Sequence, residues 1–217
     1  MKQTTLKLQR EILSQEQQRL LNTLESHFKE YVLGGGTALA MQIHHRKSFD
    51  LDFFGQKTIP KNLLLRIKTV IPVNRVARDT GDELTFYSSN IKITILHYPF
   101  PKVFADVAIN NNLRYFPLSI IAAQKAYAVG RRGAYRDYYD LYIILDQKHL
   151  VLDELIKISE DIFGTIFNPK IFLQQLVYFD DLTDFEILPV RKEQKIPDKE
   201  TIKKFFEQVV LKYLEKF

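Results

Sequence analysis

The chain has 217 residues, of which 46% are hydrophobic and 26% are charged, with a formal net charge of +5. This length fits one domain or two small ones, and the composition is typical of a globular protein. The 16 Phe and 11 Tyr residues exclude disorder as the main state, and the lack of Cys excludes disulfides, thiolate zinc sites and a cysteine nucleophile. No segment resembles a membrane span or a secretory signal, so we expect a cytoplasmic protein without membrane partners.

The N-terminal half mixes predicted helices with short predicted strands. Ser14 and Gln17 form a capping-box pattern, and apolar residues at helical spacing follow it, which predicts a helix over 15–28. A triple glycine, 34–36, separates the next strand and helix, because glycine permits the sharp turn between them. The further predictions are strands at 31–33, 48–54, 73–77, 83–88, 91–97 and 102–107, and helices at 37–45 and 61–70.

The C-terminal half is predicted to be almost entirely helical. Helices are expected at 119–131, with Ser119 as the N-cap, and at 135–146, 152–163, 169–179 and 198–217. Lysines between 192 and 204 alternate with acidic residues, which favours a solvated helix face over an RNA-binding one. This order of elements predicts an α+β fold: a core with a small mixed sheet over 1–112, followed by a helical C-terminal part over 113–217 that packs on the core.

The strongest chemical pattern joins the triple glycine to two carboxylates. On a strand over 48–54, Ser48, Asp50 and Asp52 project from one face, and Phe49, Leu51 and Phe53 project from the other face into the core. Two neighbouring carboxylates repel each other, whereas Mg²⁺ takes oxygen ligands of this kind together with substrate phosphates. A glycine-rich turn that enters a helix offers backbone N–H groups to phosphate. The combination predicts phosphoryl or nucleotidyl transfer.

A second pattern lies in the helical half. Lys125 stands among small apolar residues of its predicted helix, where it either reaches solvent or meets a phosphate. Asp137 and Asp140 share one face of the next helix with Arg136 nearby, which is equally compatible with a group of ion pairs on the helix surface.

The residues of 35–40, 46–54, 125 and 136–141 resemble, in this order, the motifs of the AbiEii/AbiGii toxin family of nucleotidyltransferases. These proteins are the toxin components of type IV toxin–antitoxin and abortive-infection systems, which act in phage defence. The resemblance implies a DNA polymerase β-like nucleotidyltransferase core, a helical C-terminal bundle and a cognate antitoxin.

The resemblance also implies roles for individual residues. It assigns nucleotide binding to Gly35, Gly36, Thr37, Arg46, Ser48 and Lys125, metal binding to Asp50 and Asp52, and catalysis to Asp50, Asp52, Lys125, Asp137 and Asp140. The implied reaction moves a nucleoside monophosphate from a nucleoside triphosphate (NTP) to an acceptor hydroxyl, on tRNA or a protein, with Mg²⁺ or Mn²⁺ as the cofactor.

The sequence departs from the wider superfamily at one place. A third carboxylate usually stands on a later strand, but the predicted strand over 91–97 carries none. Either Asp137 or Asp140 replaces it, or the metal rests on two carboxylates. The departure leaves open a catalytically silent module that binds nucleotide or protein, and a kinase-like or phosphodiesterase activity is the less favoured alternative.

Overall fold

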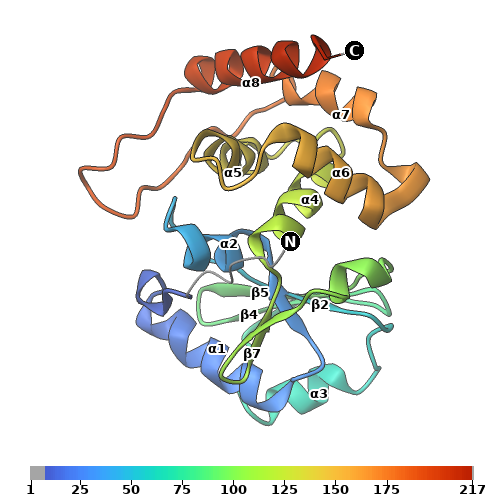
Figure 1. The fold of residues 1–217 in the computed structure, drawn as a ribbon. Helices are drawn as coiled ribbons and strands as arrows, with labels where there is room; N and C mark the ends of the chain where they lie inside the picture. The colour runs from blue at the N-terminus through green and yellow to red at the C-terminus, as the bar shows by residue number, and fades with distance from the viewer. Residues whose placement is uncertain (1–7, 217) are drawn as a thin grey trace. The chain divides into compact units, whose positions relative to one another are not determined.

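The computed structural model describes residues 8–216, and the chain divides into two compact units. The units are Met1–Pro117, which contains every strand of the described residues, and Leu118–Phe217, which is helical (Figure 1). A mixed α+β architecture with an open sheet therefore matches the fold class predicted from the sequence.

The first unit is built on a seven-stranded sheet in the order β3-β4-β5-β2-β1-β7-β6. β2 pairs with β5 in parallel and β1 pairs with β7 in parallel, while the other neighbouring strands are antiparallel. The strands are β1 (Val32–Gly34), β2 (Leu51–Gly55), β3 (Arg75–Asp79), β4 (Glu83–Ser88), β5 (Ile91–His97), β6 (Ala108–Asn110) and β7 (Leu113–Tyr115).

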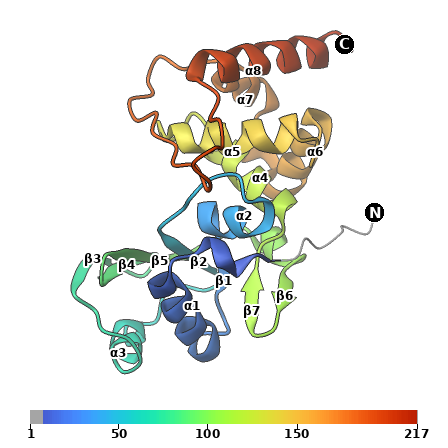
Figure 2. The ribbon, with the colours of Figure 1, turned by 90° about the vertical axis from the view of Figure 1, so that its left-hand side faces the viewer.

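Helices cover both faces of this sheet. α1 (Gln15–His27) and α3 (Leu63–Lys68) lie on one side of the strands, and α2 (Gly35–Ile43) lies on the other (Figure 2). Short 3₁₀ turns, η1 (Arg10–Ile12) and η2 (Pro101–Phe104), complete the unit. Alternation along β2 buries Leu51 and Phe53, whereas Asp52 stays partly accessible on the opposite face.

The predicted capping box at the start of α1 is confirmed. The Ser14 hydroxyl accepts a hydrogen bond from the Gln17 backbone N–H at 3.2 Å, and the Gln17 side chain accepts one from the Ser14 N–H at 3.1 Å. Gln17 also donates to the carbonyls of Ser48 and Phe49, so it ties α1 to the segment before β2.

Three predictions for the first unit are wrong. The strand predicted over 48–54 begins only at Leu51, because the carbonyls of Ser48 and Phe49 accept hydrogen bonds from Gln17 of α1. Phe49, which was expected in the core, lies before the strand and is 51% exposed. The strand predicted over 102–107 is instead η2, followed by the hairpin of β6 and β7. The positive φ of Asn111 makes the tight turn of that hairpin.

The second unit consists of five α-helices and a 3₁₀ turn among its described residues. They are α4 (Leu118–Ala128), α5 (Tyr135–Asp146), α6 (Leu152–Phe163), η3 (Gly164–Ile166), α7 (Pro169–Leu176) and α8 (Lys199–Leu214). Ser119 lies inside the first turn of α4, so its predicted role as the N-cap is wrong, whereas Asp198 caps α8 through the Thr201 N–H at 2.7 Å. Aromatic side chains such as Tyr138 and Phe206 fill the core of this unit.

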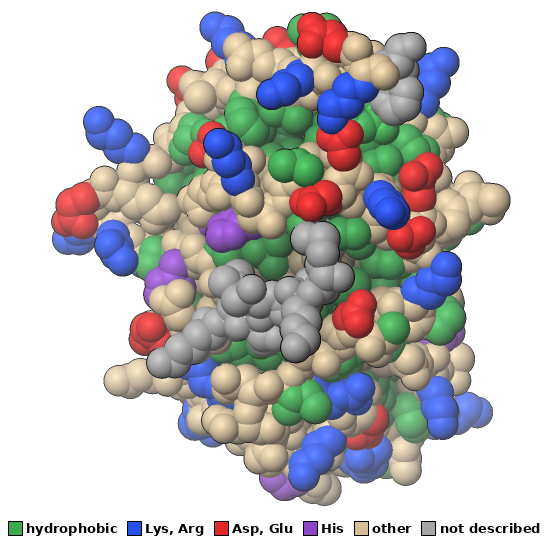
Figure 3. All heavy atoms as spheres, viewed as in Figure 1, with side chains coloured by type: hydrophobic (Ala, Val, Ile, Leu, Met, Phe, Trp, Pro, Cys, Tyr) green, Lys and Arg blue, Asp and Glu red, His purple; other side chains and the backbone are tan. Residues whose placement is uncertain are grey.

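The surface of the helical unit mixes both signs of charge. On the face drawn in Figure 3, Lys and Arg side chains lie among Asp and Glu side chains over these helices, which is typical of a solvated surface. Within residues 8–216, helices with the length and apolar character needed to cross a membrane are absent.

Candidate functional site

The glycine turn at the start of α2 lies directly against the carboxylate of Asp52. Gly35 has a φ of +65°, a conformation that side chains with a Cβ rarely adopt. A Cβ on Gly35 would stand 2.5 Å from Asp52 Oδ2, so only glycine permits this approach. The pairing of β1 with β2, in which Gly34 lies opposite Asp52, fixes the two segments side by side.

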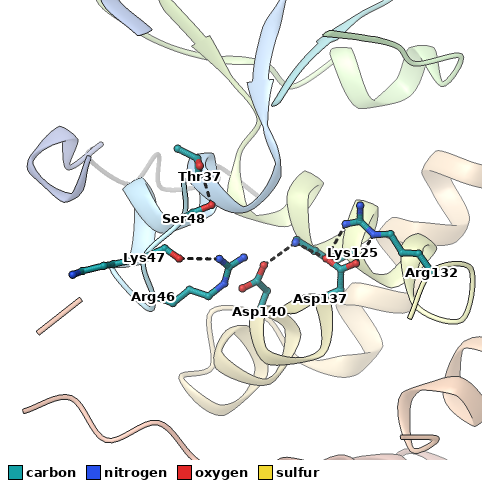
Figure 4. Close-up of polar contacts among 8 residues, drawn as sticks. All are labelled: Thr37, Arg46, Lys47, Ser48, Lys125, Arg132, Asp137 and Asp140. Atoms are coloured by element: carbon teal, nitrogen blue, oxygen red, sulfur yellow. Dashed lines mark hydrogen bonds and ion pairs between the residues drawn. The ribbon is translucent and has the colours of Figure 1, made fainter. Parts of the chain in front are cut away.

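Arg46, Ser48 and Thr37 complete the surroundings of the turn. A Cβ on Gly36 would stand 2.5 Å from Arg46 Nη2 and 3.1 Å from Ser48 Oγ, so both side chains reach the helix N-terminus. The Thr37 hydroxyl donates to the Asp50 carbonyl and lies 2.9 Å from the Ser48 hydroxyl (Figure 4). Arg46, which is only 3% exposed, donates to the Lys47 carbonyl at 3.0 Å. A buried guanidinium beside a helix N-terminus creates a positive potential suited to an anion.

Asp50 pairs with a residue that the sequence did not single out. Lys92 Nζ lies 2.8 Å from Asp50 Oδ2, and the two side chains are 36% and 33% exposed. Although partial burial opposes its charged form, the hydrogen bond and charge of Asp50 and the charge of Asp52 raise the pKa of Lys92. Lys92 is therefore cationic at neutral pH and stabilises the acidic pair.

The two carboxylates fit a divalent cation. Both are partly accessible, they stand two residues apart on the segment that enters β2, and the glycine turn packs against Asp52. Across residues 8–216, groups of three or more His, Asp or Glu side chains suited to hold a metal ion are absent. Asp50 and Asp52 are the residues that would hold a divalent cation such as Mg²⁺, which commonly binds one or two carboxylates together with substrate phosphates.

A buried charge cluster occupies the second unit. Lys125 Nζ lies 2.6 Å from Asp137 Oδ1 and 2.7 Å from Asp140 Oδ2, and Lys125 is only 5% exposed (Figure 4). Arg132 forms a bidentate pair with Asp137, from Nε to Oδ2 at 2.7 Å and from Nη2 to Oδ1 at 2.9 Å. Two cations balance two carboxylates, which offsets the cost of burying them.

These contacts settle two of the structural alternatives raised by the sequence. Lys125 does not extend into solvent, and Asp137 and Asp140 do not form a group on the helix surface, because all three are buried. Burial alone would raise the pKa of Asp137, but the charges of Lys125 and Arg132 and their hydrogen bonds lower it overall. A lowered pKa makes Asp137 a weak base.

The structure thus groups the sequence-predicted residues within each unit. Gly35, Gly36, Thr37, Arg46, Ser48, Asp50 and Asp52 come together in the first unit, and Lys125, Asp137 and Asp140 in the second. Sequence reasoning missed Lys92 and Arg132. The alternation of β5 could have pointed to Lys92, but only once its pairing with β2 was known. The Gly130–Gly133 loop, which carries Arg132, offered no such signal.

Comparisons with known proteins bear on the family and the fold of the chain. The family described as nucleotidyl transferase AbiEii toxin, Type IV TA system, matches residues 19–211. Uncharacterized protein aq_aa25 of Aquifex aeolicus (strain VF5) is 31% identical to this chain over 193 residues, which cover 86% of this chain and 89% of that protein. Among solved structures, JHP933 from Helicobacter pylori superposes with a TM-score of 0.56 at 24% identity, over 94% of this chain and 95% of that one. A proposed nucleotidyltransferase from H. pylori gives 0.56 at 23% identity, over 94% and 98% of the two chains.

Proposed function

Because the chain belongs to the AbiEii family of nucleotidyltransferase toxins from type IV toxin–antitoxin systems, we propose that it is a metal-dependent nucleotidyltransferase. It transfers a nucleoside monophosphate from an NTP to an acceptor hydroxyl and releases pyrophosphate. The observation that supports this proposal is the close approach of the Asp52 carboxylate to the Gly35 turn, since a helix N-terminus is suited to bind phosphate and a carboxylate is suited to bind a metal ion.

In this proposal, different residues of the first unit bind the triphosphate and the metal ion. The N–H groups at the start of α2, where Gly34 is the N-cap residue, would bind the triphosphate. Arg46 adds positive charge at Gly36, and Thr37 and Ser48 fix the segment that carries Asp50. Asp50 and Asp52 would hold Mg²⁺ or Mn²⁺, which neutralises phosphate charge and lowers the pKa of an acceptor hydroxyl.

The second unit contributes a lysine whose role rests on the family motif. Lys125 makes ion pairs with Asp137 and Asp140, and a contact of its ammonium group with a nucleotide phosphate is proposed from the family motif alone. Asp137 and Asp140 act as positioning residues that hold Lys125, and the lowered pKa of Asp137 disfavours a role as the base. The acceptor, on tRNA or a protein, the cognate antitoxin and a cytoplasmic role in phage defence are proposed from the family alone.

The test is transfer of label from each of the four α-labelled NTPs with Mg²⁺ to total RNA and to protein. We expect label to be incorporated from at least one NTP. Asp52→Asn, which keeps the shape of the side chain but removes its charge, should abolish incorporation. Asp106→Asn removes the charge of an exposed carboxylate in the same unit and should leave incorporation unchanged. Equal incorporation by the parent and Asp52→Asn would refute the assignment.

A second candidate function is a catalytically silent module that binds nucleotide. The ion pair between Asp50 and Lys92 favours it, because a metal ligand that is held by an ammonium group is partly neutralised. In that case, NTP binding measured by calorimetry would persist in the parent while no acceptor became labelled.

A further inference from the structure

The charge of the acidic pair is already partly balanced by the chain itself. Asp50 and Asp52 contribute two negative charges, and Lys92 contributes one positive charge at 2.8 Å from Asp50 Oδ2. The three groups therefore carry a net charge of −1. Without nucleotide, one bound divalent cation would reverse this to +1, whereas a second one would raise it to +3, which electrostatic repulsion opposes.

The position of Lys92 is fixed by the sheet. β5 pairs with β2 in parallel over five successive residue pairs, in which Asp52 lies opposite Thr94. Lys92 and Asp50 each precede these two residues by two positions, so the same register sets Lys92 beside Asp50. On its other side Lys92 lies opposite Tyr87 of β4, and the guanidinium of Arg75 stacks 4.1 Å from the centroid of that ring. Tyr87 and the positive charge of Arg75 thus bound Lys92 on the side away from Asp50.

We propose that the ammonium group of Lys92 occupies the position beside Asp50 that a second divalent ion would otherwise take. The carboxylates of Asp50 and Asp52 therefore bind one divalent ion and not two. This inference rests on the proposed function and names a specificity-determining residue for its metal. The ammonium group contacts Asp50 Oδ2, so Asp52 and the other oxygen of Asp50 are the groups that would hold the single ion.

The test is a titration of the full chain with Mn²⁺, in which the electron paramagnetic resonance signal measures the free Mn²⁺. The titration is carried out once without nucleotide and once with a non-hydrolysable ATP analogue. The parent should bind one Mn²⁺. Lys92→Met keeps the aliphatic stem and removes the charge, and it should tighten Mn²⁺ binding by about tenfold. Lys92→Glu should add a second Mn²⁺. Lys92→Arg keeps the charge and should behave as the parent does.

The matched control is Lys61→Met. Lys61 is an exposed lysine just before α3, the helix on the opposite face of the sheet from α2, so its loss changes net charge equally without changing the site (Figure 2). Parent-like Mn²⁺ binding in both Lys92→Met and Lys92→Glu would overturn the inference, as would two Mn²⁺ ions bound to the parent. If either of these results is obtained and Asp52→Asn still abolishes Mn²⁺ binding, the inference about Lys92 fails but the proposed function survives. If the parent binds no Mn²⁺ under either condition, both proposals fail.

Discussion

Replacing Gly35 by alanine separates the chemical importance of the glycine turn from its effect on stability. The added Cβ would stand 2.5 Å from Asp52 Oδ2, and ordinary contacts begin at 3.4 Å, so the carboxylate must move by about 0.9 Å. Metal ligands tolerate displacements of only about 0.2 Å. The positive φ of Gly35 adds backbone strain of about 1–3 kcal/mol. We therefore expect Gly35→Ala to lose both stability and Mn²⁺ affinity, the latter by about tenfold or more.

Two other glycines serve as controls for these separate effects. Gly164 also has a positive φ, but a Cβ there meets no atom within 4 Å, so Gly164→Ala should lose about 1–3 kcal/mol without any change in Mn²⁺ binding. Gly81 has neither a positive φ nor close neighbours, so Gly81→Ala should change neither property. Urea unfolding and Mn²⁺ titration measure the two quantities. Unchanged Mn²⁺ affinity in Gly35→Ala would refute the role assigned to this contact.

Three further predictions concern stability, measured by urea unfolding. Ser14→Ala should cost about 1 kcal/mol, because it removes the cap of α1, and an unchanged midpoint would contradict this role. Lys125→Met leaves Asp137 and Asp140 buried without the ammonium between them and should cost about 3–5 kcal/mol, whereas the exposed Lys157→Met should cost less than about 0.5 kcal/mol. The pKa of Asp137 is lowered from 3.8, so the carboxylate stabilises the folded state fully above that pH, and this contribution is lost as the pH falls below it. On acidification to about pH 3, the free energy of unfolding should therefore fall less in Asp137→Asn than in the parent.

Local patterns were enough to predict the elements that build the site. The cap of α1, the triple glycine at the start of α2 and the alternation of 51–53 along β2 are all contained in stretches of a few residues, whereas Asp50 lies before that strand. Each pattern expresses a local physical constraint: a hydrogen bond to an N-terminal N–H, a backbone without Cβ, or alternation along a strand. Such constraints do not depend on which distant segment pairs with them.

The features that sequence reasoning missed depend on contacts between distant segments. β6 and β7 have three residues each, which is too short for alternation to show, and their hairpin is defined by the turn at Asn111. The exposure of Phe49 follows from hydrogen bonds that Gln17 makes to the segment before β2, thirty-one and thirty-two residues away along the chain. Lys92 becomes part of the acidic site only through the parallel register of β2 and β5.

Each unit contains an ion pair between a lysine and a carboxylate that the family motifs assign to metal binding or catalysis. The pairs are Lys92 with Asp50 and Lys125 with Asp137, and they differ in burial. The side chains of Lys92 and Asp50 are about one-third exposed, so water screens their attraction and a divalent cation can compete for the remaining oxygen. The side chains of Lys125 and Asp137 are 6% and 2% exposed, so exchange there would leave a buried charge without compensation. The first pair can therefore adjust the charge of a binding site, whereas the second fixes the geometry of its helices. For this reason we assign metal selection to Lys92, and to Asp137 and Asp140 only the positioning of Lys125.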